Sequence, residues 1–416
     1  MKTLIVWFPA RWSMRAMPLL LLVLIFTSCS GSPASATPTP TSGTARSGSG
    51  STTTTRVAGA NPTPTATLLP GVKLGPQPCP DAVKDPSHWD PIIPTQNGVT
   101  QAEAVSCGNL VGDASLQALV NVYHQGTGQI LDVYVYTNIT SSSPKQLFKL
   151  EQLYKGDARI SGNNTVITNE VDENSVLNKG QGNAALIEDL DREFAWSASA
   201  NAFVQVAFPG MFPDLTRYQA EADQNQVAQG HQLWKLDAAM TAQALAEYFL
   251  QWFPNPAAKI QSGGGPHDLN AVVLVNNPDA DGGSIQVTLS RLEGNTNGIW
   301  EVVDVTSPDI SMTTPQSGKL LTSPISVGGT DMASGDMVGA ATIFDHLYTA
   351  TGFGYTYYAS NQGSTGPVGY SGFITYTSSF QNGAQEGIVA NYMYKRFQGP
   401  ITRAVMRKVL LSATGT

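Results

Sequence analysis

The sequence predicts a mainly β protein with an α+β module in its middle, and three observations lead to this class. Short runs rich in β-branched and aromatic residues recur through 78–210 and 320–412, separated by turn residues. Between them, 211–307 begins with two helical patterns and ends with four strand patterns. These three regions together are too long for one hydrophobic core. We therefore expect an antiparallel β module, an α+β module and a β-sandwich, in that order.

The first module shows the two-residue alternation of β-strands. Leu131, Val133 and Val135 are separated by polar or aromatic residues, which is typical of a strand with one buried face. A glycine-containing turn at 125–128 joins two such runs, so we expect antiparallel pairing. The expected strands are 118–123, 130–136, 146–154, 166–169, 194–196 and 202–208.

The middle module has two expected helices followed by a meander of strands. Asp237 stands immediately before a run with apolar residues at helical spacing, so its side chain is expected to cap that helix. Asp214 precedes a more polar helical stretch, and Pro254 ends the second helix. This order of elements looks like the cone-shaped nuclear-transport-factor-2-like fold, and such an analogy implies no function. The expected strands are 258–261, 271–275, 285–292 and 299–305.

The N-terminal residues 1–28 have the pattern of a signal peptide. Lys2, Arg11 and Arg15 precede an apolar run at 17–26. A run of this length is too short for a bilayer core, which needs about 20 residues. A positive flank with a short apolar core predicts an exported protein.

The residues Phe26-Thr27-Ser28-Cys29 resemble the lipobox of bacterial lipoproteins, in which small residues precede a lipid-carrying cysteine. Phe26 departs from the leucine that the family prefers, which leaves ordinary secretion open, with cleavage after Ala36 as the alternative. The resemblance implies a diacylglyceryl group on Cys29, and its two acyl chains are enough for stable anchoring. We expect an extracytoplasmic protein that is held at the cell surface by this lipid.

Residues 29–77 form the expected linker between the lipid and the first module. Up to Pro70 they are nearly all Ser, Thr, Pro, Gly and Ala. A segment of this composition cannot bury enough apolar surface to fold. We expect a disordered spacer.

The remaining cysteines, Cys79 and Cys107, make an even number in an exported chain, which predicts one disulfide. No CxxC motif or Cys/His cluster occurs, so a structural zinc ion is not expected. Removal of the signal peptide takes three positive charges away and changes the formal net charge from −8 to −11. This acidic balance argues against nucleic acid and against a polybasic membrane contact.

No catalytic constellation and no cofactor motif appears in the sequence. The five histidines lie far apart, and neither an HExxH motif nor a nucleophile elbow occurs. We therefore expect no enzyme and no cofactor. A hydrolase assembled from distant residues and a solute-binding lipoprotein stay open as alternatives.

Two acidic segments are candidate cation sites. The turn at 276–283 contains Asp279 and Asp281, whose oxygens suit Ca²⁺, although Asn, Asp and Gly are also ordinary turn residues. The run 188–193 contains four carboxylates, and a solvated edge is the expected meaning. Both segments are interpreted mainly as surface structure.

Tyrosines gather in the third module, where strand alternation should turn some of them outward. Exposed tyrosine favours recognition because it gives a large contact area with little loss of entropy. The sequence therefore predicts a binding face in this module, with cross-strand packing as the alternative. The tyrosines are Tyr348, Tyr355, Tyr357, Tyr358, Tyr370, Tyr376, Tyr392 and Tyr394.

The third module also resembles the immunoglobulin-like domain of bacterial spore germination, over roughly 90 residues. In this family a Ser-Pro opening is followed by a Gly-Ala-x-x-Phe strand, a Gly-Phe strand and a last strand after a Gly-hydrophobic run. Here the turn before the last strand, 395–400, departs from the family's acidic Ser/Gly turn. The resemblance implies a non-catalytic extracytoplasmic module. The matching segments are 321–325, 337–345, Gly372-Phe373, 387–389 and 403–411.

These observations together predict a surface-tethered, non-catalytic binding or scaffold lipoprotein. Its expected contacts are the membrane, through the lipid, and an unidentified protein or envelope polymer.

Overall fold

The computed structural model describes residues 69–93, 100–126, 129–279, 282–293, 296–332, 338–359, 366–395 and 399–414. Cys29, the expected signal peptide, most of the expected linker and Asp281 lie outside these residues. The described part consists mainly of antiparallel strands with two α-helices, which confirms the mainly β class. Neither of these two helices of the described part has the length and the apolar composition of a transmembrane segment.

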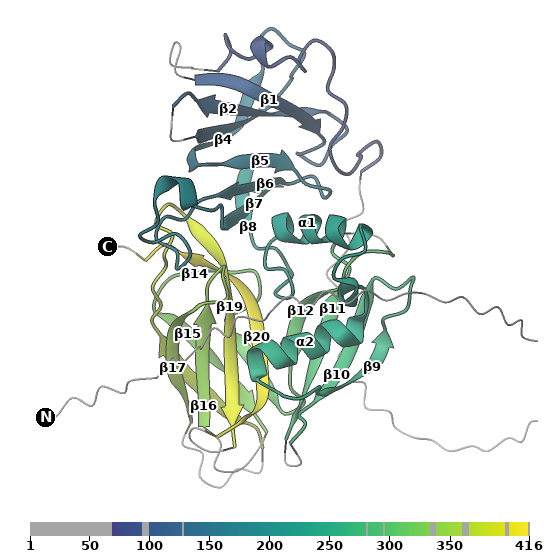
Figure 1. Cartoon of the computed structure of the whole chain (residues 1–416), viewed down its shortest axis with the longest axis vertical. Helices are drawn as coiled ribbons and strands as arrows, with labels where there is room; N and C mark the ends of the chain where they lie inside the picture. Colours follow the sequence, from purple (N-terminus) through teal and green to yellow (C-terminus); the bar gives the residue numbers. More distant parts are fainter. Residues whose placement is uncertain are drawn as a thin grey trace, which may run out of the picture. The chain divides into compact units, whose positions relative to one another are not determined.

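The first region contains two four-stranded antiparallel sheets, and in each of them the strands are hydrogen-bonded in chain order (Figure 1). The first sheet consists of β1 (Thr100–Gly108), β2 (Gln117–His124), β3 (Ile130–Thr137) and β4 (Lys145–Tyr154). The second consists of β5 (Asp157–Ile160), β6 (Val166–Glu170), β7 (Leu190–Ser197) and β8 (Ala202–Val206).

Strand β3 confirms the predicted alternation and adds a second buried face. Leu131, Val133 and Val135 belong to the core shared with the second sheet. Tyr134 and Tyr136 point to the opposite face and are also buried, at 3% exposure each. The sequence predicted one buried face because it gave no sign that the segment before β1 folds back over the sheet.

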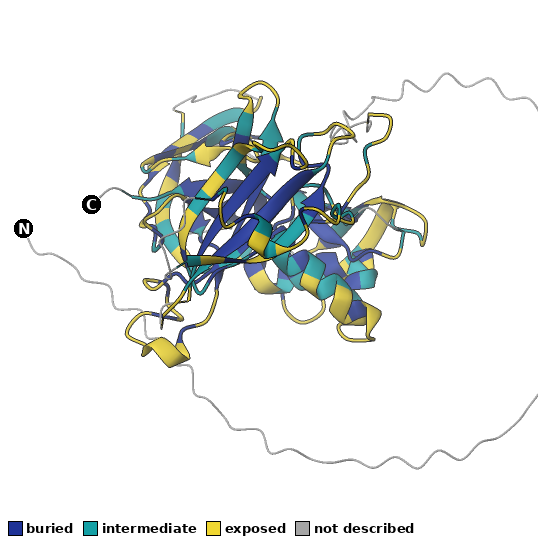
Figure 2. Ribbon diagram, turned by 90° about the horizontal axis from the view of Figure 1, so that it is seen from above, coloured by how far each residue is buried: buried dark blue, intermediate teal, exposed yellow. Residues whose placement is uncertain are grey.

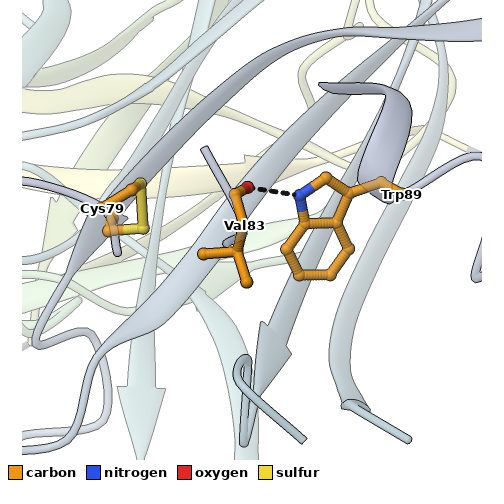
Figure 3. The surroundings of a disulfide bond; sticks show 4 residues. Cys79, Val83 and Trp89 are labelled. Atoms are coloured by element: carbon orange, nitrogen blue, oxygen red, sulfur yellow. Dashed lines mark hydrogen bonds between the residues drawn. A yellow bond between two sulfur atoms is a disulfide. The ribbon is translucent and has the colours of Figure 1, made fainter. Parts of the chain in front are cut away.

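That covering segment is fastened by the predicted disulfide between Cys79 and Cys107, which the structure confirms. Trp89 is fully buried against the first sheet, and its indole N–H donates to the carbonyl oxygen of Val83 at 2.9 Å (Figure 3). Val83 and Ile93 belong to the same core.

The two helices lie in the middle region, at α1 (Arg217–Ala228) and α2 (Ala238–Leu250). Asp237 caps α2 as predicted, because its carboxylate accepts from the backbone N–H groups of Ala239 and Met240. Thr216, and not Asp214, caps α1 by accepting from the N–H of Gln219.

All later strands join one twelve-stranded sheet, ordered β13-β15-β18-β17-β16-β19-β20-β12-β11-β10-β9, with β14 beside β20 (Figure 1). The strands of the middle region are β9 (Ala257–Gly263), β10 (Asn270–Asn276), β11 (Ser284–Ser290) and β12 (Glu301–Thr306). Those that follow are β13 (Ile310–Thr314), β14 (Leu320–Leu321), β15 (Ile325–Asp331), β16 (Val338–Phe344), β17 (Ala350–Tyr358), β18 (Val368–Ile374), β19 (Ala384–Tyr394) and β20 (Ile401–Ser412).

The sheet is continuous between the two regions because Val305 of β12 pairs with Met406 of β20. One core joins Phe249 of α2 to Val287 of β11 and Ile388 of β19. A second core lies on the other face of β19 and β20, where Val389 packs with Val327 of β15, so the last strands form two packed layers. In Figure 2 the strands in the middle of the view are buried over most of their length.

Candidate functional site

An exposed aromatic surface lies on β17 and β18. Successive side chains of a strand point to opposite faces. On β17, Phe353, Tyr355 and Tyr357 are 57%, 39% and 69% exposed, while Thr356 between them is buried. We call these three rings, together with Phe373 of β18, the aromatic face.

Phe373 joins the aromatic face through the strand register. Tyr357 pairs with Ser371, so Phe373 lies two residues further along β18, beside Tyr355. The backbones are close here, since a Cβ on Gly372 would lie 2.7 Å from the carbonyl oxygen of Tyr355. Phe373 is 77% exposed, and the rings of Phe353 and Tyr355 meet edge to face with centroids 5.4 Å apart.

Hydroxyl groups continue this surface across the next two strands. Ser326 of β15 pairs directly with Phe373, and Thr330 of β15 pairs with Ser311 of β13. The hydroxyls of Ser311 and Thr330 lie 2.8 Å apart, and that of Thr313 donates to the carbonyl oxygen of Gly328 at 3.3 Å. The exposed side chains thus change from aromatic rings on β17 and β18 to hydroxyl groups on β15 and β13.

The four strands that form this surface carry no exposed charge. Asp331 is the only ionisable acid or base, tyrosines aside, on β13, β15, β17 and β18. Its side chain is fully buried and pairs with Arg403 at 3.0 Å. In a protein with a formal net charge of −8, four neighbouring strands therefore present a neutral outer surface.

The predicted tyrosine face is only partly made of the predicted tyrosines. Tyr370, Tyr376 and Tyr392 are buried, and the hydroxyl of Tyr370 donates to the carbonyl oxygen of Ser311 at 2.7 Å. Tyr355 and Tyr357 are exposed, as expected. The sequence reasoning did not include Phe353 and Phe373 in the binding face. Each stands next to a glycine, Gly354 or Gly372, within a strand pattern, and this alternation could have indicated that the ring lies on the outer face.

The candidate calcium turn is described only in part. The N–H of Asp279 donates to Oδ1 of Asn277 at 2.9 Å, and the N–H of Gly282 donates to the carbonyl oxygen of Asp279 at 2.8 Å. Both bonds are those of a turn. Within the described ranges, no group of three or more His, Cys, Asp or Glu side chains is placed to hold a metal ion. Calcium binding by Asp279 and Asp281 stays a prediction.

The acidic run at 188–193 is not the solvated edge that the sequence indicated. Asp191 is 3% exposed and accepts from the hydroxyl of Thr216 at 2.7 Å. Glu193 pairs with Arg217 at 2.6 Å. Burial raises the pKa of Asp191 above its usual range. The prediction was wrong because these partners lie more than 20 residues away in the sequence and leave no local pattern.

Further buried charges join the segment between β8 and α1 to the last two strands. Lys408 is 1% exposed, donates to the carbonyl oxygen of Gly210 at 2.8 Å and lies 3.3 Å from Glu386. The other oxygen of Glu386 accepts from the N–H of Phe208 at 2.9 Å. Burial raises the pKa of Glu386 to about 7 and lowers the pKa of Lys408. The hydrogen bonds of this pair run to backbone groups in the interior, which indicates a structural role.

Neither a comparison with protein-family models nor a comparison with curated proteins gave a match to this chain.

Proposed function

We propose that this protein is a non-catalytic lipoprotein of the cell surface that binds an uncharged glycan of the envelope through the aromatic face. The observation that carries the proposal is the exposure of four aromatic rings on two adjacent strands that have no exposed charge. Large exposed apolar surfaces on soluble domains are characteristic of binding sites.

The chemistry of the surface favours a neutral sugar polymer. The C–H faces of sugar rings pack against aromatic rings, and sugar hydroxyls exchange hydrogen bonds with serine and threonine hydroxyls. Ser326 and Thr330 place such groups beside Phe373 and on the neighbouring part of β15. An anionic polymer would find no lysine or arginine on these strands.

The sequence supports the location and the modular design. The lipobox-like residues that end at Cys29 and the Pro/Thr-rich linker suit a protein held at a distance from a membrane. The spore-germination resemblance of 320–412 supports an immunoglobulin-like sandwich of a non-catalytic family. The order of α1, α2 and β9 to β12 supports a nuclear-transport-factor-2-like fold for 211–307.

The test is co-sedimentation of the full-length protein, in detergent, with insoluble envelope polysaccharide. We expect saturable binding, and we expect Phe373→Ala to weaken it at least about tenfold, or ~1.4 kcal/mol, as for a central aromatic contact. Phe373→Tyr keeps a ring and should retain most of the binding.

A matched control is Met240→Ala, which removes another half-exposed apolar side chain, on α2 and outside the aromatic face. Its binding should equal that of the unchanged protein. If no polysaccharide is sedimented with the protein, or if Phe373→Ala and Met240→Ala bind alike, the proposal is wrong.

A further inference from the structure

A hollow of about 370 Å³ lies where β4, the segment after β6 and the segment before β19 meet. We call it the acidic hollow. Among the described residues, its lining includes three carboxylate residues and two aromatic residues, and no lysine, arginine or histidine. These residues are Glu170, Asp172, Glu173, Tyr154 and Phe380.

Only one of the three carboxylates is neutralised by an ion pair among the described residues. Glu170 pairs with Arg192, and both side chains are almost fully buried. The guanidinium of Arg192 also lies over the ring of Phe380, 5.1 Å from its centroid. Asp172 and Glu173 have no cationic partner in the described part of the chain, so the hollow has an excess of negative charge.

Asp172 has a carboxylate oxygen without a hydrogen-bond partner. Its side chain is 2% exposed, and its Oδ1 accepts from the N–H of Asn174 at 3.0 Å. Its Oδ2 is buried and has no hydrogen-bond partner in the described structure. Leaving a buried charged acceptor unsatisfied is unfavourable, so a positive charge close to Asp172 would stabilise its carboxylate.

Other carboxylates nearby increase the negative potential at Asp172. The backbone N–H of Asp172 donates to Oδ1 of Asp189 at 2.9 Å. Burial raises the pKa values of Asp189 and Asp345, the charge of His346 lowers both, and the negative charge of Asp172 raises both a little. A positive charge in the hollow would relieve this repulsion.

The shape and the lining favour an organic cation over a metal ion. The part of the chain that is described has no set of three ligating side chains arranged for a metal. The hollow is also larger than a single ion requires, and Tyr154 and Phe380 provide rings beside the carboxylates. Aromatic rings together with carboxylates are the groups that bind ammonium ions.

We propose that the acidic hollow binds a small organic molecule with a primary ammonium group, whose positive charge is neutralised by the carboxylates of Asp172 and Glu173 in its lining. This site is separate from the aromatic face and does not depend on glycan binding.

The test is calorimetric titration of the full-length protein with cadaverine at constant ionic strength, beside titrations with arginine and with calcium chloride. We expect saturable binding of cadaverine, at least tenfold weaker in Asp172→Asn and measurably weaker in Glu173→Gln. Glu103→Gln is the matched control, because it removes one exposed carboxylate from β1, outside the hollow, and should leave the affinity unchanged.

Glu173 is exposed, so its variant keeps the test valid if Asp172→Asn does not fold. The proposal is overturned if cadaverine shows no saturable binding, or if all three variants bind it equally. It is also overturned if calcium binds in the hollow, with loss of binding in Asp172→Asn, while cadaverine does not. If arginine binds tightly and cadaverine does not, the hollow selects a guanidinium group and not a primary ammonium group. This result would refute the assignment.

Discussion

Removal of the disulfide should loosen one segment and leave the rest of the protein unchanged. The bond joins Cys79 to Cys107, which are 28 residues apart, and so fastens the segment that covers the outer face of the first sheet. The double variant Cys79→Ala/Cys107→Ala removes this link. The buried side chains of Val83, Trp89 and Ile93 then hold the segment without covalent help.

The magnitude follows from the loop that the bond closes. For the 28-residue separation, the chain-entropy relation gives roughly 3.5 kcal/mol of stabilisation. This corresponds to about a 300-fold increase in the population of the opened segment when the bond is absent. The effect is local because the segment contacts the first sheet, while the twelve-stranded sheet has its own cores.

The assay is hydrogen exchange followed by mass spectrometry, on peptides that cover 79–93 and β1. Their exchange should be up to about 300-fold faster in the double variant than in the unchanged protein. Peptides from β19 and β20 serve as the internal control. Unchanged exchange in 79–93 would refute the reasoning, since packing alone would then hold the segment. Equal acceleration in β19 and β20 would show that the effect is global.

Two further predictions concern the buried charges and the anchor. Burial raises the pKa of Glu386 from 4.5 to about 7, so the folded state binds this proton more tightly than the unfolded state does. The contribution of Glu386 to stability should therefore be greatest below pH 4.5 and should fall as the pH rises to about 7, by at most about 3 kcal/mol. Chemical unfolding at pH 5 and pH 7 measures this difference, and an equally steep change in Glu386→Gln would contradict the assignment. Cys29→Ala should move the protein from the membrane fraction to the soluble fraction, because the two acyl chains are lost. Fractionation of expressing cells checks this, and undiminished membrane retention would show that Cys29 carries no lipid.

The features that sequence reasoning predicted well depend on neighbours in the chain. The alternation at Leu131, Val133 and Val135 and the cap at Asp237 are local patterns, and both are present in the structure. The disulfide followed from a count of cysteines, because only one pair was available once Cys29 was assigned to the lipid.

The features that it missed depend on residues far apart in the sequence. Asp191 and Glu193 are buried because α1 supplies Thr216 and Arg217, which no spacing rule connects to them. The alternation along β18 places Phe373 on one face of the strand. It does not indicate whether that face is packed against another part of the chain or stays exposed. The acidic hollow was missed for a similar reason, since its lining comes from segments about 200 residues apart.

The position of β20 in the large sheet affects how the protein can be made. This strand pairs with β19 over its whole length, touches β12 at Val305 and lies parallel to β14, yet it follows all three of these strands in the chain. Until 401–412 leave the ribosome, β12 and β19 each lack a neighbour and expose open edges that can pair with other chains. A nascent chain that stops before β20 is therefore a ready substrate for aggregation or proteolysis.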